Sequence, residues 1–122
     1  MRLNRNAVAY GVVLAALCGA TAVAHMAVQK TMPEDGAVLT QSPHHIQVWY
    51  TQSPDPAISR ITLEGAGGDV DLGDTKVVND KSLVAMLPST LRAGAYTVKW
   101  RTAGDDGHAQ RGDFTFTVRA SD

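Results

Sequence analysis

Two stretches near the C-terminal end of the chain alternate strictly between apolar and polar residues, and this pattern constrains the fold most strongly. The apolar positions are Tyr96, Val98 and Trp100 in one stretch and Phe114, Phe116 and Val118 in the other. Successive side chains of a β-strand point to opposite faces, so a period of two gives each stretch one apolar face. Both stretches are therefore predicted to be strands of a sheet with one buried and one solvated face.

Shorter runs with the same alternation fill much of the chain after residue 30, and turn-forming residues separate them. These runs cover residues 47–50, 58–63 and 83–87. The segment 65–74 (GAGGDVDLGD) is polar and rich in Gly and Asp, so it is expected to carry short strands at best. No stretch after residue 30 has a helical period over a useful length. The pattern predicts an all-β protein, an immunoglobulin-like Greek-key β-sandwich of about seven strands.

The stretch Leu91-x-x-Gly94-x-Tyr96 is typical of the tyrosine corner of Greek-key sandwiches. In that motif the tyrosine hydroxyl bonds to backbone a few residues upstream. We therefore expect Tyr96 to be structural. Trp49 and Trp100 are likewise interpreted as residues of the core or of a sheet face.

The first 24 residues are typical of a secretory signal peptide. Arg2 and Arg5 precede an apolar stretch at residues 7–20, which is shorter than the roughly 20 residues that cross a bilayer. Small residues before and at Ala24 predict cleavage after Ala24. We therefore expect an exported domain of residues 25–122 in the periplasm, and we expect that this domain does not insert into the membrane. The bulky residue before Cys18 argues against lipidation, so this single cysteine leaves with the signal. An uncleaved membrane anchor is the alternative.

Charge and motifs exclude several functional classes. The formal net charge is −1, from 11 basic and 12 acidic residues, and no basic run is present, so nucleic acid is not an expected partner. The chain has no glycine-rich phosphate loop before a helix and no Gly-x-Ser-x-Gly motif. Its carboxylates are scattered over predicted loops. The sequence is therefore interpreted as that of a protein that is not an enzyme.

The histidines are the remaining candidates for chemistry. Cleavage after Ala24 would make His25 the first residue, whose α-amine and imidazole Nδ1 can close one ring on a metal ion. Asp106 and His108 lie two residues apart, so on an extended segment both side chains face the same way. Together, three nitrogens and one oxygen suit Cu(II), although Zn²⁺ could take the same groups tetrahedrally. The alternative is that residues 104–108 (GDDGH) form only a surface turn.

Two further histidines, His44 and His45, precede the predicted strand at residues 47–50. Neighbouring residues on a strand point to opposite faces, so these two are not expected to share one ion. We interpret both as solvated loop residues. Asp105 is interpreted as a turn residue and not as a ligand.

At these positions the chain resembles the CopC family of periplasmic copper-binding proteins over nearly the whole of residues 25–122. The residues that carry the resemblance are His25, Met32-Pro33-Glu34-Asp35-Gly36-Ala37, Ser42-Pro43, the run IQVWYTQ, Leu91 to Arg101, Asp106-Gly107-His108, and Gly112-x-Phe114-x-Phe116-x-Val118. The resemblance implies a carrier or buffer that binds one Cu(II) per chain through the amine and imidazole of His25, Asp106 and His108. It also implies a possible partner, a membrane copper importer of the CopD type.

The chain departs from the family pattern at two places. Some members carry a methionine-rich loop for Cu(I), but here only Met26, Met32 and Met86 follow the predicted signal, widely spaced. Many members also have an acidic residue near the copper site, where this chain has the neutral Gln52. We expect this change to alter the affinity for copper.

Two other functions stay open at the level of sequence. The domain could be a metal-free immunoglobulin-like interaction module, because this fold hosts many functions. It could also be a copper-dependent oxidative enzyme whose N-terminal histidine forms a brace on the metal. A catalytic metal must keep one coordination position free, and Asp106 would occupy that position here.

Overall fold

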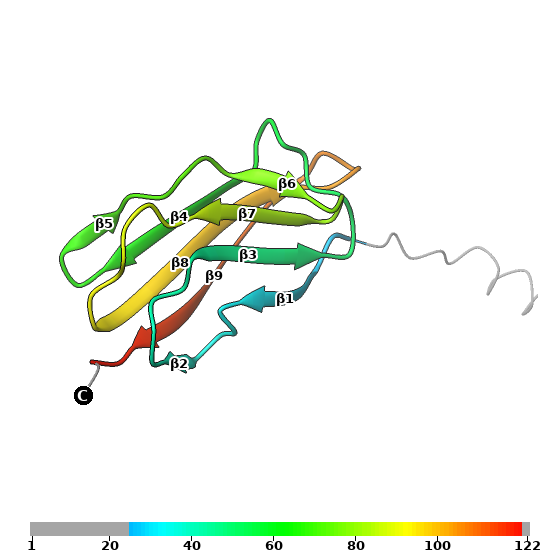
Figure 1. The fold of residues 1–122 in the computed structure, drawn as a ribbon. Coiled ribbons are helices and arrows are strands. Elements are labelled where there is room, and N and C mark those ends of the chain that lie inside the picture. Colours follow the sequence, from blue (N-terminus) through cyan, green and yellow to red (C-terminus); the bar gives the residue numbers. More distant parts are fainter. Residues whose placement is uncertain (1–24, 121–122) are drawn as a thin grey trace, which may run out of the picture.

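The computed structural model describes residues 25–120, which form two β-sheets packed face to face (Figure 1). The predicted signal peptide, with Arg2, Arg5, Cys18 and the cleavage site after Ala24, lies outside the described residues. Within residues 25–120 there is no helix long and apolar enough to cross a membrane.

Nine strands make up the two sheets within the described residues. The four-stranded sheet has the order β1-β3-β7-β6, formed by β1 (Val28–Met32), β3 (His45–Tyr50), β7 (Ser82–Met86) and β6 (Lys76–Val78). The five-stranded sheet has the order β2-β9-β8-β4-β5, formed by β2 (Ala37–Leu39), β9 (Ala109–Val118), β8 (Gly94–Ala103), β4 (Arg60–Gly65) and β5 (Gly68–Val70). The pairing of β2 with β9 is parallel, and the other pairings within these residues are antiparallel.

The all-β sandwich predicted from the sequence is confirmed, with more strands than the expected seven or so. Four strands lie outside the predicted alternating runs: β1 and the three-residue strands β2, β5 and β6. Two of them, β5 and β6, come from the turn-rich region after β4, where each pairs at the edge of a different sheet. Edge positions suit such short strands because they offer little backbone for pairing with another chain.

The core lies between the sheets and follows the predicted alternation. Residues Ile46, Val48 and Tyr50 of β3, Leu63 of β4, Val98 of β8 and Phe116 of β9 are at most 1% exposed. Full burial of an aliphatic or aromatic side chain contributes about 1.5–3 kcal/mol relative to exposure. The apolar faces of the long strands therefore hold the two sheets together.

The tyrosine corner is present. The Tyr96 hydroxyl donates a 2.6 Å hydrogen bond to the carbonyl oxygen of Arg92, and its ring stacks on Phe116 with centroids 5.4 Å apart. Trp100 is half-buried against the core and meets the ring of Tyr50 edge-on. Trp49 is also half-buried, with the Lys30 ammonium 4.3 Å from its ring centroid. These aromatic residues have the structural positions expected of them.

The two buried tyrosines provide a matched test of the corner, because only one of them has a partner. The Tyr50 hydroxyl is buried without a hydrogen-bond partner within residues 25–120, and burial raises the pKa of this phenol. Tyr96→Phe is expected to lower the free energy of unfolding by about 1 kcal/mol, because it removes a hydrogen bond and leaves the Arg92 carbonyl oxygen without that donor. Tyr50→Phe is expected to leave stability unchanged or to raise it, since a partnerless polar group is removed. Urea unfolding measures both, and equal losses would contradict the assignment.

Candidate metal centre

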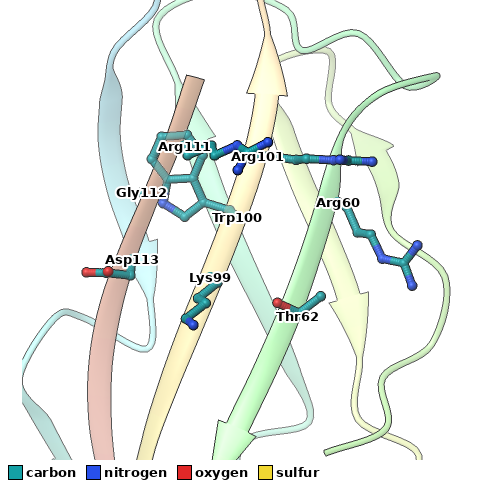
Figure 2. Close-up of a pocket in the computed structure, with 8 residues that line it drawn as sticks. All are labelled: Arg60, Thr62, Lys99, Trp100, Arg101, Arg111, Gly112 and Asp113. Atoms are coloured by element: carbon teal, nitrogen blue, oxygen red, sulfur yellow. The ribbon is translucent and has the colours of Figure 1, made fainter. Parts of the chain in front are cut away.

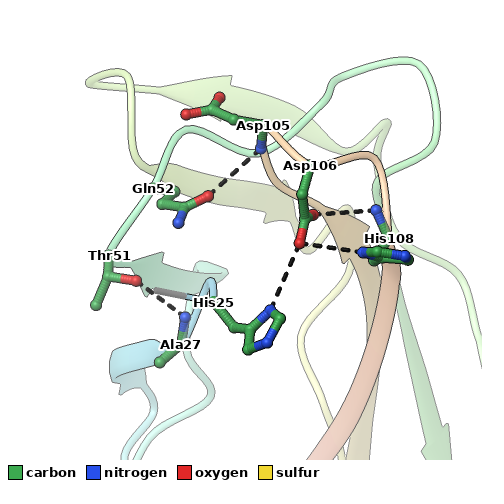
Figure 3. A network of polar contacts seen from close by, with 7 residues as sticks. All are labelled: His25, Ala27, Thr51, Gln52, Asp105, Asp106 and His108. Atoms are coloured by element: carbon green, nitrogen blue, oxygen red, sulfur yellow. Dashed lines mark hydrogen bonds and ion pairs between the residues drawn. The ribbon is translucent and has the colours of Figure 1, made fainter. Parts of the chain in front are cut away.

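One loop and the start of the described chain form the candidate site. Strands β8 and β9 are paired over their whole length, from Gly94 opposite Val118 to Ala103 opposite Ala109. The loop 104–108 closes this hairpin. In it the Gly107 N–H donates to the Gly104 carbonyl at 3.0 Å, which closes a four-residue turn. Figure 3 shows His25 beside this loop.

His25 is held there by the two residues that follow it. The Ala27 N–H donates to the Thr51 hydroxyl at 2.9 Å (Figure 3). The Thr51 N–H donates in turn to the Ala27 carbonyl at 2.9 Å. Met26 is 4% exposed and belongs to the hydrophobic core. These anchors are not apparent from the sequence, because no local pattern indicates a bond between segments so distant in the chain.

Asp106 connects both predicted histidine ligands. Its Oδ2 atom lies 3.2 Å from Nδ1 of His108 and 3.5 Å from Nδ1 of His25. Its other oxygen, Oδ1, accepts a 3.1 Å hydrogen bond from the His108 backbone N–H. The side chain of Asp106 is 30% exposed, whereas those of His25 and His108 are 67% and 80% exposed. The structure therefore brings the three predicted side chains together around one carboxylate at the surface (Figure 3).

The hydrogen bonds from His108 favour the charged form of Asp106. They lower the pKa of this carboxyl. The His108 backbone N–H has the largest effect, the His108 imidazole the next, and His25 a smaller one. Asp106 is thus ionised at neutral pH. An ionised carboxylate flanked by two imidazoles is a donor set for a borderline metal ion.

The three side chains are neighbours, but they do not yet enclose a shared space for an ion. Both imidazoles face the same carboxylate oxygen, and the described residues contain no group of three or more His, Cys, Asp or Glu already arranged around a metal position. The assignment of His25, Asp106 and His108 as metal ligands stays a prediction.

Gln52, which follows β3, contacts Asp105 of the same loop. The Asp105 N–H points at the Gln52 Oε1 atom over 3.4 Å, a long hydrogen bond (Figure 3). Gln52 follows Thr51, so one short segment contacts both the loop and the start of the chain. Asp105 is exposed and occupies the turn, as its sequence context predicts.

The other two histidines are far from this loop. His45 opens β3, and its Nε2 atom lies 3.2 Å from Oε1 of Gln47, so it belongs to a strand and not to the expected loop. His44 is exposed, and its carbonyl accepts a hydrogen bond from Leu87. The candidate site lies beyond the opposite end of β3, next to Thr51. Six strand residues at about 3.3 Å each separate the two places, so neither histidine shares the ion of the predicted site.

The family model for the CopC domain matches residues 28–119, and the chain belongs to the CopC family. Copper resistance protein C from Escherichia coli is 29% identical over 109 residues, covering 81% of this chain and 85% of that protein. Protein YobA from Escherichia coli K12 is 27% identical over 99 residues, covering 79% of this chain and 80% of that protein.

A solved structure supports the same assignment. The crystal structure of PcoC, a methionine-rich copper resistance protein from Escherichia coli, is similar with a TM-score of 0.71 and 26% identity. The match covers 79% of this chain and 100% of the PcoC chain. The family resemblance and the sandwich fold inferred from the sequence are therefore confirmed.

The backbone conformation at Gly107 predicts that the loop requires glycine at this position. Its φ of 74° lies in the left-handed region, where a Cβ is unfavourable. Gly107→Ala is expected to lower the free energy of unfolding by about 1–2 kcal/mol, and Gly107→Asn by less, because Asn tolerates this conformation. Urea unfolding measures the difference. Gly67→Ala, in a turn where an added Cβ meets nothing within 4 Å, is the control. A Gly107→Ala loss no larger than that of Gly67→Ala would contradict the requirement.

Proposed function

We propose that this protein binds one Cu(II) per chain outside the cytoplasm and acts as a copper carrier or buffer. The observation that carries the proposal is the approach of His25 and His108 to one oxygen of Asp106, at 3.5 and 3.2 Å. Membership of the CopC family supports it, as do relatives that are named copper resistance proteins.

The proposed ligands become complete only after removal of the signal. In the uncleaved chain the backbone nitrogen of His25 is an amide, whereas cleavage after Ala24 turns it into an amine that binds metal. The amine and Nδ1 of His25 then form one chelate ring, and His108 adds a third nitrogen. Asp106 supplies an oxygen and a negative charge. Cu(II) prefers three nitrogens and an oxygen in a tetragonal arrangement.

The same donor set favours transport of copper over catalysis. Four protein donors fill the square plane of Cu(II), and an enzyme needs an open position for its substrate. We therefore propose that the ion is cargo, exchanged with a partner by replacement of ligands. A membrane copper importer of the CopD type, expected from the family resemblance, is the proposed recipient.

Electron paramagnetic resonance during a Cu(II) titration tests the ligand set. Protein that begins at His25 is expected to give a one-to-one tetragonal spectrum with three coupled nitrogens. One extra residue before His25 converts the amine into an amide and is expected to weaken binding at least tenfold, about 1.4 kcal/mol. His108→Ala is expected to weaken it to a similar degree and to remove one nitrogen from the spectrum.

His44→Ala is the matched control for that titration, because His44 is exposed and lies at the other end of β3. It is expected to leave both the spectrum and the affinity unchanged. Binding that is indifferent to the N-terminus and to His108 would overturn the proposed site. It would favour the interaction module that the sequence leaves open.

A second measurement separates the carrier from the oxidative enzyme. With a reductant and oxygen, a copper site with an open position produces hydrogen peroxide continuously. The copper-loaded protein is expected to produce it no faster than the Asp106→Asn variant, which keeps the imidazoles and has no carboxylate. Sustained production above that level by the unmodified protein would contradict the carrier proposal.

A further inference from the structure

Three arginines lie side by side on the outer face of the five-stranded sheet. Arg60 of β4 is directly opposite Arg101 of β8, and Arg101 is directly opposite Arg111 of β9. All three are exposed, because they alternate with core residues such as Ile61 and Phe114 that face the other sheet. We call Arg60, Arg101 and Arg111 the arginine row; Figure 2 shows it across three neighbouring strands.

The arginine row has no anionic partner within the described residues. The ion pairs found there involve His25, His108 and Lys99, and none includes an arginine of the row. Lys99, on the same face, is already paired with Glu64 at 3.0 Å. Like charges directly opposite one another on neighbouring strands destabilise a sheet. Two such pairs in one row are a cost to the fold that binding of an anion would offset.

The surface around the row is shaped to receive a ligand. The arginines line a shallow hollow of about 560 Å³, together with Lys99, Asp113 and Trp100. Trp100 and Gly112 border it, but they belong to the core-facing side of the sheet, where the indole ring lies against Gly112 and meets Tyr50. The hollow therefore gathers three guanidinium groups that have no ion-pair partner within the described residues (Figure 2).

We propose that the arginine row is a docking surface for an acidic segment of a partner protein. A guanidinium group binds a carboxylate through two parallel hydrogen bonds. Neighbouring strands are about 4.8 Å apart, and alternate side chains of an extended segment are about 6.8 Å apart, so long arginine side chains bridge the difference. A segment that crosses the strands with acidic residues at alternate positions can pair with the whole row.

The flanking charges favour a narrow segment over an anionic membrane. Asp113 lies beside Arg111 on the same face, Glu64 lies farther along β4, and the chain as a whole has a formal charge of −1. A flat anionic surface would meet these carboxylates together with the arginines. A single extended segment across the strands can follow the three arginines and meets only Asp113 of these carboxylates.

The row is also next to the candidate metal centre. The Arg101–Arg111 pair is two pairs away from Ala103–Ala109, the last pair before the loop that contains Asp106 and His108. A docked partner would therefore lie beside that loop. Docking itself does not require copper, so this inference does not depend on the proposed function.

Fluorescence anisotropy with a labelled peptide of alternating Glu and Ser residues tests the docking surface. The protein is the metal-free chain from His25 onward, which contains every described strand. The peptide is expected to bind at low ionic strength and to be released by salt, whereas its Gln–Ser counterpart is not expected to bind. The triple variant Arg60→Gln, Arg101→Gln and Arg111→Gln is expected to weaken binding at least tenfold.

A charge-matched variant makes the test specific to the row. Lys81→Gln, Arg92→Gln and Arg119→Gln together remove the same charge from exposed residues outside the row, and this variant is expected to bind within twofold of the unmodified protein. Equal weakening in both variants would overturn the proposal, because it would reflect overall charge alone. Binding to vesicles of phosphatidylglycerol and phosphatidylcholine without binding to the peptide would also overturn it. Since copper is absent, either failure leaves the copper titration unaffected.

A stability measurement tests the unpaired state of the row independently. Arg101→Gln removes the central charge and both like-charge pairs. It is expected to raise the thermal midpoint by a few degrees at low ionic strength, and by less at high salt. A lower midpoint would show that Arg101 is already paired favourably, which would overturn the premise of the proposal.

Discussion

The register of the β8–β9 hairpin is the constraint on which the other features depend. Ten residue pairs run from Gly94–Val118 to Ala103–Ala109. Because side chains alternate along a strand, a shift by one residue would exchange the two faces of the hairpin. The present register turns Phe114 and Phe116 into the core and aligns Arg101 with Arg111 on the surface. It also places the loop 104–108 at the end of the sandwich. Core, arginine row and candidate metal centre are thus consequences of one pairing.

The candidate site needs a second constraint, which comes from the other sheet. His25 is not part of any strand, and its position is set by the bonds between Ala27 and Thr51 and by the burial of Met26. These contacts bring the start of the described chain to the loop that carries Asp106. The site is therefore assembled from two sheets, each supplying a rigid support. The position of the exposed His25 imidazole therefore depends on the burial of its neighbour Met26.

The sequence predicts the parts of this structure that are determined locally. Alternation identified β3, β4, β7, β8 and β9 with their buried faces, and the spacing before Tyr96 identified the tyrosine corner. The parallel pairing of β2 with β9 was not predictable, since no local pattern shows which distant strand an edge segment joins. The arginine row was missed for the same reason. Arg60 and Arg111 become neighbours of Arg101 only through the pairing of three strands. For the site, the sequence proposed the side chains but not what holds them together.

The exposure of the candidate ligands bears on how cargo would leave the protein. A deeply buried ion can be transferred only if the fold opens, which would disturb the core. Here His25 and His108 are 67% and 80% exposed, so an incoming ligand can approach without movement of the sheets. Two residues of the arginine row, Arg101 and Arg111, lie on the hairpin that carries this loop, so the row can hold an acidic segment at a fixed distance from it. Holding a partner beside the ion converts ligand exchange into a step within one complex, which raises the effective concentration of the acceptor. Docking of the partner through its acidic segment and release of the ion by ligand exchange would therefore take place at the same end of the molecule.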